Sequence, residues 1–150
     1  VNAVIFNPSA SILVSASYDH SMVMWDAVQF TTIRVVRHHE AAVLSLAISI
    51  EGSVIASGDA NGTLLLTRMS DGVCLRALRG HDDSITGVAF IDNIGLVVTC
   101  SADETVKLWE LRGKCIKSFR AHSGSVSALC VSVLDEMIVT VGEDHFGRVF

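Results

Sequence analysis

The sequence predicts an all-β fold made of short antiparallel strands in repeated units. Half of the 150 residues are apolar, and Val, Ile and Leu are interleaved with Ser, Thr and Gly, a composition typical of strands. Similar segments recur about every 42 residues along the whole chain. No segment keeps the 3.6-residue apolar period of an amphipathic helix, so we expect no helices.

Two independent columns of residues define the repeat. The first column marks the start of an apolar strand, at Val1, Val43, Ile85 and Val126. The second column is a polar residue expected in a tight turn, at Asp19, Asn61, Asp103 and Asp144. Both columns have spacings of 42, 42 and 41 residues. Their agreement predicts four units, at about residues 1–42, 43–84, 85–125 and 126–150.

The third unit shows the four strands that we expect in a complete unit. They cover residues 85–90, 96–100, 106–109 and 115–119. Tight turns are expected at Asp103 and Gly113. In the second unit the corresponding turn contains Asn61-Gly62, a pair that readily adopts the positive φ angles of a type I′ hairpin. The fourth unit has room for three strands only, so we expect three complete units followed by a three-stranded one.

Charge, hydropathy and cysteine content exclude several classes of function. The formal net charge of −5 makes duplex nucleic acid an unfavourable partner, since its binding depends on neutralising phosphates. No apolar run approaches the roughly 20 residues of a membrane helix, so we expect no membrane insertion. The four cysteines form no Cys-x-x-Cys pair, which predicts free thiols in a reducing, intracellular compartment, cytoplasmic or nuclear, and no metal site.

The residue types of a hydrolase are present without its pattern. Ser or Thr, His and Asp recur in most units, which suits a structural role better than a single active site. There is no Gly-x-Ser-x-Gly nucleophile elbow and no glycine-rich phosphate loop. We therefore expect no catalytic residues and no cofactor.

Three dipeptides, at fixed positions in the repeat, carry a resemblance to a known family. Gly80-His81, Trp25-Asp26 and Trp109-Glu110 have the spacing of the Gly-His and Trp-Asp pairs of WD repeats, so the sequence resembles the WD-repeat family of β-propellers over essentially its whole length. The resemblance implies blades of four antiparallel strands, about three and three-quarter repeats. Because a propeller needs about 4 to 8 blades, we expect the remaining blades to come from a longer parent chain.

The resemblance also implies a hydrogen-bonded tetrad in each complete blade. The full match is His81, Thr99, Asp103 and Trp109. The residues at equivalent positions in the other units are expected to be structural as well: Ser15, Asp19, Trp25, His39, Ser57, Asn61, His122, Thr140 and Asp144. The second unit departs from the pattern, with Asn61 in place of Asp and Thr67 in place of Trp. The fourth unit has Phe150 at the Trp position.

By this resemblance the expected function is that of a non-catalytic scaffold that presents protein partners on a rigid propeller. The candidate partner-binding residues lie near the expected strand entries and turns: Tyr18, Thr86 and Glu143. An alternative function is that of a substrate receptor of a cullin–RING ubiquitin ligase. Trp109-Glu110-Leu111-Arg112 resembles the motif by which some WD-repeat proteins dock on the ligase adaptor, with Arg112 reaching an acidic pocket. A second alternative is the targeting module of a larger multidomain enzyme.

Overall fold

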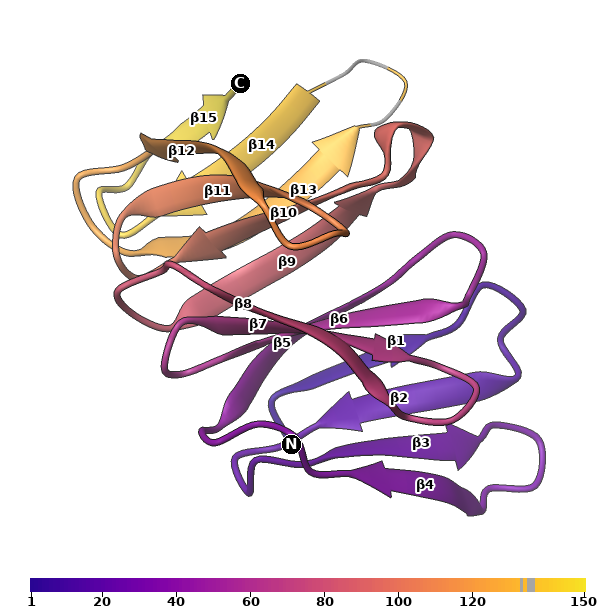
Figure 1. Ribbon diagram of the computed structural model, residues 1–150. Coiled ribbons are helices and arrows are strands. Elements are labelled where there is room, and N and C mark those ends of the chain that lie inside the picture. Colours follow the sequence, from indigo (N-terminus) through magenta and orange to yellow (C-terminus); the bar gives the residue numbers. More distant parts are fainter. Residues whose placement is uncertain (133, 135–136) are drawn as a thin grey trace.

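The computed structural model describes residues 1–132, 134 and 137–150 and shows four successive antiparallel sheets (Figure 1). The first sheet contains β1 (Ala3–Phe6), β2 (Ile12–Ala16), β3 (Met22–Asp26) and β4 (Thr32–Val36). The second contains β5 (Val43–Ile48), β6 (Val54–Asp59), β7 (Thr63–Arg68) and β8 (Cys74–Arg79). The third contains β9 (Ile85–Ile91), β10 (Leu96–Ser101), β11 (Thr105–Glu110) and β12 (Cys115–Arg120). The fourth contains β13 (Val126–Ser132), β14 (Met137–Gly142) and β15 (Gly147–Val149).

Each sheet is a simple meander, because every strand pairs with the strand that follows it in sequence. The predicted all-β class is therefore confirmed. The described residues contain no α-helix, but the prediction missed one 3-10 turn, Asp92–Ile94, between β9 and β10. The predicted type I′ hairpin in the second sheet is wrong. Residues 60–62 join β6 to β7, and only Gly62 has a positive φ there, at 75°.

Three apolar clusters lie between successive sheets, where one sheet packs on the next. Met22 and Met24 of the first sheet pack with Ile55 of the second. Leu64, Leu66 and Leu78 of the second sheet pack with Phe90, Val97 and Trp109 of the third. Val98, Cys100 and Val106 of the third pack with Val126 of the fourth. The hydrophobic core is therefore divided among the contacts between sheets, as expected when single sheets cannot bury their own faces.

Polar side chains at the start of each sheet tie it to the next one. Asn2 Nδ2 donates to the Val43 carbonyl at 2.8 Å, and Ser45 Oγ donates to the Ile85 carbonyl at 3.0 Å. The Thr86 hydroxyl donates in the same way to the Val126 carbonyl. In all three cases the acceptor is the first residue of the first strand of the next sheet. These bonds fix the relative position of neighbouring first strands.

No helix in the described part of the chain is long and apolar enough to cross a membrane.

Candidate interaction surface

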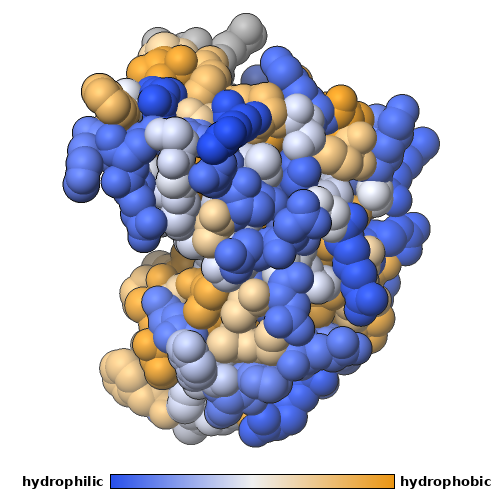
Figure 2. Space-filling view, turned by 90° about the vertical axis from the view of Figure 1, so that its left-hand side faces the viewer, coloured by the Kyte–Doolittle hydropathy of each residue, from blue (hydrophilic) through white to orange (hydrophobic). Residues whose placement is uncertain are grey.

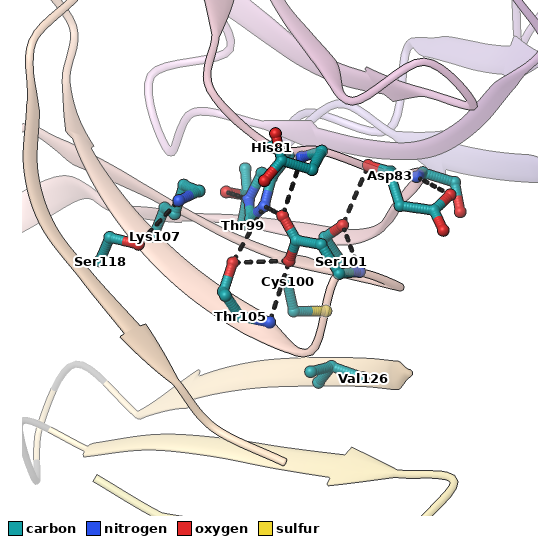
Figure 3. A network of polar contacts seen from close by, with 12 residues as sticks. His81, Asp83, Thr99, Cys100, Ser101, Thr105, Lys107, Ser118 and Val126 are labelled. Carbon is teal, nitrogen blue, oxygen red and sulfur yellow. Dashed lines mark hydrogen bonds and ion pairs between the residues drawn. The ribbon is translucent and has the colours of Figure 1, made fainter. Parts of the chain in front are cut away.

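The third sheet contains a continuous hydrogen-bonded set beneath one of its turns (Figure 3). His81 lies in the loop before β9, and its Nδ1 is 2.7 Å from Asp103 Oδ2, in the turn after β10. Its Nε2 is 2.7 Å from Thr99 Oγ1, which also accepts the indole N–H of Trp109 at 2.8 Å. His81 and Thr99 point toward each other in Figure 3. The set links the loop, the second strand, the turn and the third strand.

The protonation states of this set follow from its surroundings. Burial lowers the pKa of His81, and the attraction of Asp103 does not fully offset this, so the imidazole is neutral. Burial would raise the pKa of Asp103, but hydrogen bonds from Thr105, His81 and the Asp82 N–H outweigh it and lower that pKa. The ionised carboxylate can only accept, so the imidazole proton lies on Nδ1 and Nε2 accepts from the Thr99 hydroxyl.

The second sheet has the same set with a different acid. His39 Nε2 is 2.7 Å from Ser57 Oγ, and its Nδ1 is 2.8 Å from Asp59 Oδ2. Asp59 therefore supplies the carboxylate, two residues before Asn61, which the repeat alignment placed at the position of the acid. Its Oδ1 accepts the backbone N–H groups of Asn61 and Thr63, both at 2.9 Å. Burial would raise the pKa of Asp59, but the bond from His39 and these N–H groups lower it.

The second sheet also lacks the indole donor. Thr67 occupies the position of Trp109, is fully buried, and its hydroxyl has no hydrogen-bond partner among the described residues. A buried hydroxyl without a partner loses its hydration and gains nothing in return. Met69, two residues after Thr67, belongs to the apolar cluster between the first and second sheets.

Thr67→Val is expected to leave the free energy of unfolding unchanged or to raise it by up to about 1 kcal/mol, because valine has nearly the same shape and no hydroxyl. The matched change Thr99→Val is expected to lower it by about 1–3 kcal/mol, since it leaves His81 and Trp109 without their partner. Urea unfolding of both variants checks this. A loss of stability in Thr67→Val equal to that in Thr99→Val would contradict the contrast.

The outer two sheets contain partial sets. In the fourth sheet His122 Nδ1 is 2.8 Å from Asp144 Oδ1, and its Nε2 is 2.8 Å from Thr140 Oγ1. Phe150 takes the Trp position and packs against Phe119, with ring centroids 4.8 Å apart. In the first sheet the indole N–H of Trp25 donates to Ser15 Oγ at 2.9 Å. Asp19 accepts from the Ser21 hydroxyl there at 2.6 Å, instead of pairing with a histidine.

The turns above these sets form one face of the molecule, which we call the turn face. It consists of the turns that join the second and third strands of each sheet: residues 17–21, 60–62, 102–104 and 143–146. These turns lie at the left of Figure 1, and Figure 2 views that side, where hydrophilic residues predominate. Tyr18 is 72% exposed and Glu143 is also exposed, so both predicted contact residues are available to a partner on this face.

The other two candidates lie outside these turns. Thr86 is the second residue of β9, at the end of its sheet next to the turn face, and it is half-buried. Its hydroxyl donates to the Val126 carbonyl, so it contributes to the contact between sheets, and its contact with a partner stays a prediction. Arg112 is exposed and makes no hydrogen bond or ion pair in the described part of the chain. It lies in the turn between β11 and β12, at the opposite end of β11 from the turn face. Arg112 and Tyr18 therefore belong to different surfaces.

No group of three or more potential ligands among His, Cys, Asp and Glu could hold a metal ion in the described residues. The four cysteines are free, and burial raises the pKa of the Cys100 thiol to about 11. This thiol is therefore protonated at neutral pH and is not a nucleophile.

Because folding lowers the pKa values of His81 and of three aspartates, we expect the protein to lose stability in acid. The pKa of His81 is lowered by folding, so the unfolded chain binds a proton first as the pH falls through about 6.5, and unfolding becomes more favourable. The pKa values of Asp59, Asp103 and Asp144 are also lowered, so their contribution is present above about pH 4 and is lost below it.

We therefore expect the urea midpoint to fall between pH 7 and pH 5, and again below pH 4. His81→Gln is expected to make the first decrease smaller, because the glutamine does not titrate. His20→Gln, at an exposed turn residue, should leave the decrease as it is. An unchanged pH profile in His81→Gln would contradict the assignment of a neutral His81.

The stacked antiparallel sheets, three of them with a buried histidine–carboxylate contact, define blades of a β-propeller. Comparison with known proteins agrees. The family model described as "WD domain, G-beta repeat" matches residues 1–26, 30–66, 72–110 and 113–150. This chain therefore belongs to the WD-repeat family, which confirms the resemblance found in the sequence.

Named relatives and solved structures share the repeat. The chain is 30% identical to "Target of rapamycin complex subunit LST8" of Saccharomyces cerevisiae over 121 residues, which covers 80% of this chain and 40% of that protein. It is 31% identical to human "Striatin-3" over 136 residues, 76% of this chain and 17% of that protein. "Structure of U3-55K" superposes with a TM-score of 0.89 at 26% identity, covering 99% of this chain and 51% of the other. The chain thus spans less than half of the two relatives and about half of the solved structure.

Proposed function

We propose that this chain forms part of a non-catalytic propeller that binds protein partners on its turn face. One observation carries the proposal: three successive sheets hold their turns in place with a buried histidine–carboxylate contact. The distances are 2.8 Å for His39–Asp59, 2.7 Å for His81–Asp103 and 2.8 Å for His122–Asp144. The contacts of His81 and His122 join the loop entering a sheet to the turn above it, and His39 contacts Asp59 at the end of the strand that leads into the turn, where Asp59 accepts the N–H groups of Asn61 and Thr63. A turn fixed in this way loses little entropy when a partner binds.

The named relatives support a role in assemblies. LST8 is named as a subunit of the target of rapamycin complex, and SWD3 of Saccharomyces cerevisiae is named as a component of COMPASS. By analogy we propose protein partners for this chain, within the cytoplasm or nucleus, and further blades supplied by the polypeptide that contains it.

The ubiquitin-ligase receptor function has one supporting feature. Arg112 is exposed and unpaired in the described part of the chain, as a docking arginine would have to be. It lies outside the turn face, so it can be tested independently. The remaining alternative, a targeting module of a larger enzyme, uses the same turn face and differs only in what the rest of the polypeptide does.

Quantitative co-purification from the natural cell tests the proposal, with the full-length polypeptide as bait. The turn-face variant Tyr18→Ala and the combined variant Tyr18→Ala/Glu143→Lys are expected to lose at least one partner that wild type retains. Arg112→Ala, with a solvent-exposed change at the opposite end of a blade, is expected to retain it. If Arg112→Ala alone loses a ligase adaptor, the receptor function replaces the proposal. If no variant loses any protein, the turn face is not the binding surface.

A further inference from the structure

The first sheet exposes an apolar face, whereas the equivalent faces of the second and third sheets are covered. On the second and third sheets, the equivalent residues lie within the clusters that pack against the preceding sheet, among them Ile55, Phe90, Val97 and Trp109. On the first sheet the corresponding positions are Phe6, Leu13 and Trp25, and Phe6 is 55% exposed. With Phe30 these side chains line an open cavity of about 160 Å³.

Phe30 is the unusual residue on this face. It is 86% exposed and has a positive φ of 56°, a conformation that is costly for a large side chain. The equivalent residues of the next two sheets are Gly72 and Gly113, with φ of 72° and 114°. The backbone requirement is therefore the same in all three turns, and only the first sheet meets it with an aromatic residue.

The turn holds Phe30 firmly in this conformation. Asp26 Oδ1 accepts the backbone N–H groups of Val28 and Gln29, both at 2.8 Å. The Phe30 N–H donates to the Asp26 carbonyl at 2.9 Å. Three hydrogen bonds to one residue fix the backbone of the turn, so the point from which the phenyl ring projects is set before anything contacts it.

The two glycines show what the first atom of a side chain at this position would meet. A Cβ atom on Gly72 would lie 3.1 Å from Val36 Cγ2 and 2.6 Å from Arg34 Cδ, both on β4, the outer strand of the preceding sheet. A Cβ atom on Gly113 would lie 3.5 Å from Leu78 Cδ2, on β8, the outer strand before it. Val36 and Leu78 occupy the same position in their sheets. In the second and third sheets, the turn between the third and fourth strands thus lies against the outer strand of the preceding sheet.

We infer that Phe30 is an anchor for a further sheet of this design, which covers the exposed face of β1–β4 and carries a small side chain where β4 has Val36 and β8 has Leu78. A valine or leucine there would occupy the space that the ring needs. The occupant is a blade of the same polypeptide, because the covered faces of the second and third sheets are each packed by a blade with this geometry. The inference rests on the proposed propeller, but it concerns the blade contact and not the turn face.

The sign of one stability change tests the inference in the full-length polypeptide. If the ring is seated against another blade, Phe30→Gly removes apolar contact and lowers the urea midpoint, even though glycine suits the positive φ. If the ring is in water, the same change relieves the conformational cost and raises the midpoint. Ala10→Gly, at an exposed residue with φ of 54° and no ring, is the control and is expected to raise it.

A lower midpoint for Phe30→Gly beside a higher one for Ala10→Gly supports the inference, and a higher midpoint for both overturns it. A decrease that depends on protein concentration also overturns it, since the occupant is then a second copy. If Phe30→Gly does not fold, thiol labelling decides. Phe30→Cys should react at least tenfold more slowly than the adjacent exposed Gln29→Cys, and equal rates overturn the inference. Neither measurement involves Tyr18 or Glu143, so failure here is distinct from failure of the proposed function.

Discussion

Trp109→Ala is expected to lower the free energy of unfolding by about 3–5 kcal/mol, the usual range for removing a buried tryptophan. Trp109 is 2% exposed and lies in the cluster between the second and third sheets with Leu66 and Leu78. Its removal opens a cavity in that contact. It also removes the indole donor to Thr99, so the set around His81 loses one of its bonds. Urea or thermal unfolding measures the loss.

Trp25→Ala is the matched control for this prediction. Trp25 occupies the same position in the first sheet and makes the same type of bond, to Ser15 at 2.9 Å, but its side chain is only partly buried. In the isolated 150-residue chain its removal is expected to cost about 1–2 kcal/mol, since less apolar surface is exposed on unfolding. Equal losses for the two variants would show that packing between the sheets does not govern stability.

Gly62→Ala is expected to destabilise the fold by about 2–4 kcal/mol, the sum of an unfavourable backbone conformation and a steric clash. Gly62 has a φ of 75°, and an added Cβ atom would lie 2.5 Å from the carbonyl oxygen of His81. That contact is with backbone, which cannot rotate away as a side chain would. The clash displaces the loop that carries His81, and so weakens the contact with Asp103.

Gly95→Ala separates the two causes. Gly95 has a similar φ of 66°, but an added Cβ atom there meets nothing within 4 Å. It is expected to cost about 1–2 kcal/mol, the conformational part alone. The difference between the two variants in chemical denaturation then measures the clash at His81. A Gly62→Ala variant no less stable than Gly95→Ala would mean that the loop and turn are not in tight contact.

The fold could be predicted almost completely from the sequence, because a repeat multiplies weak signals. A single pair such as Trp109-Glu110 is uninformative, but its recurrence at the spacing of Trp25-Asp26 fixes the register of the strands. The set around His81 contains the four residues that the family resemblance implied. These side chains have few partners that satisfy both a donor and an acceptor, so their identity restricts the geometry.

The sequence did not reveal features that depend on the backbone. Asp59 was missed because the repeat alignment assumes that the acid lies at the same position in every unit, which is Asn61 in the second. In the structure the acid lies two residues before that position, at the end of β6, and still reaches His39. Its being the acid nearest the turn is the signal that could have identified it. The acceptors of Ser45 and Thr86 are carbonyl groups 40 residues away, and no residue type marks a carbonyl. The positive φ of Phe30 could not be predicted either, since a phenylalanine, unlike a glycine, does not indicate that conformation.

Site-specific photo-crosslinking tests the central claim, that partners bind the turn face. A photoreactive phenylalanine analogue is placed at residue 18 or at residue 112 in the full-length polypeptide, expressed in its natural cell, and the products are identified by mass spectrometry. The account predicts a crosslinked protein partner from residue 18 and none from residue 112. A partner crosslinked from residue 112 alone, with none from residue 18, would contradict it and place binding at the opposite end of the blades.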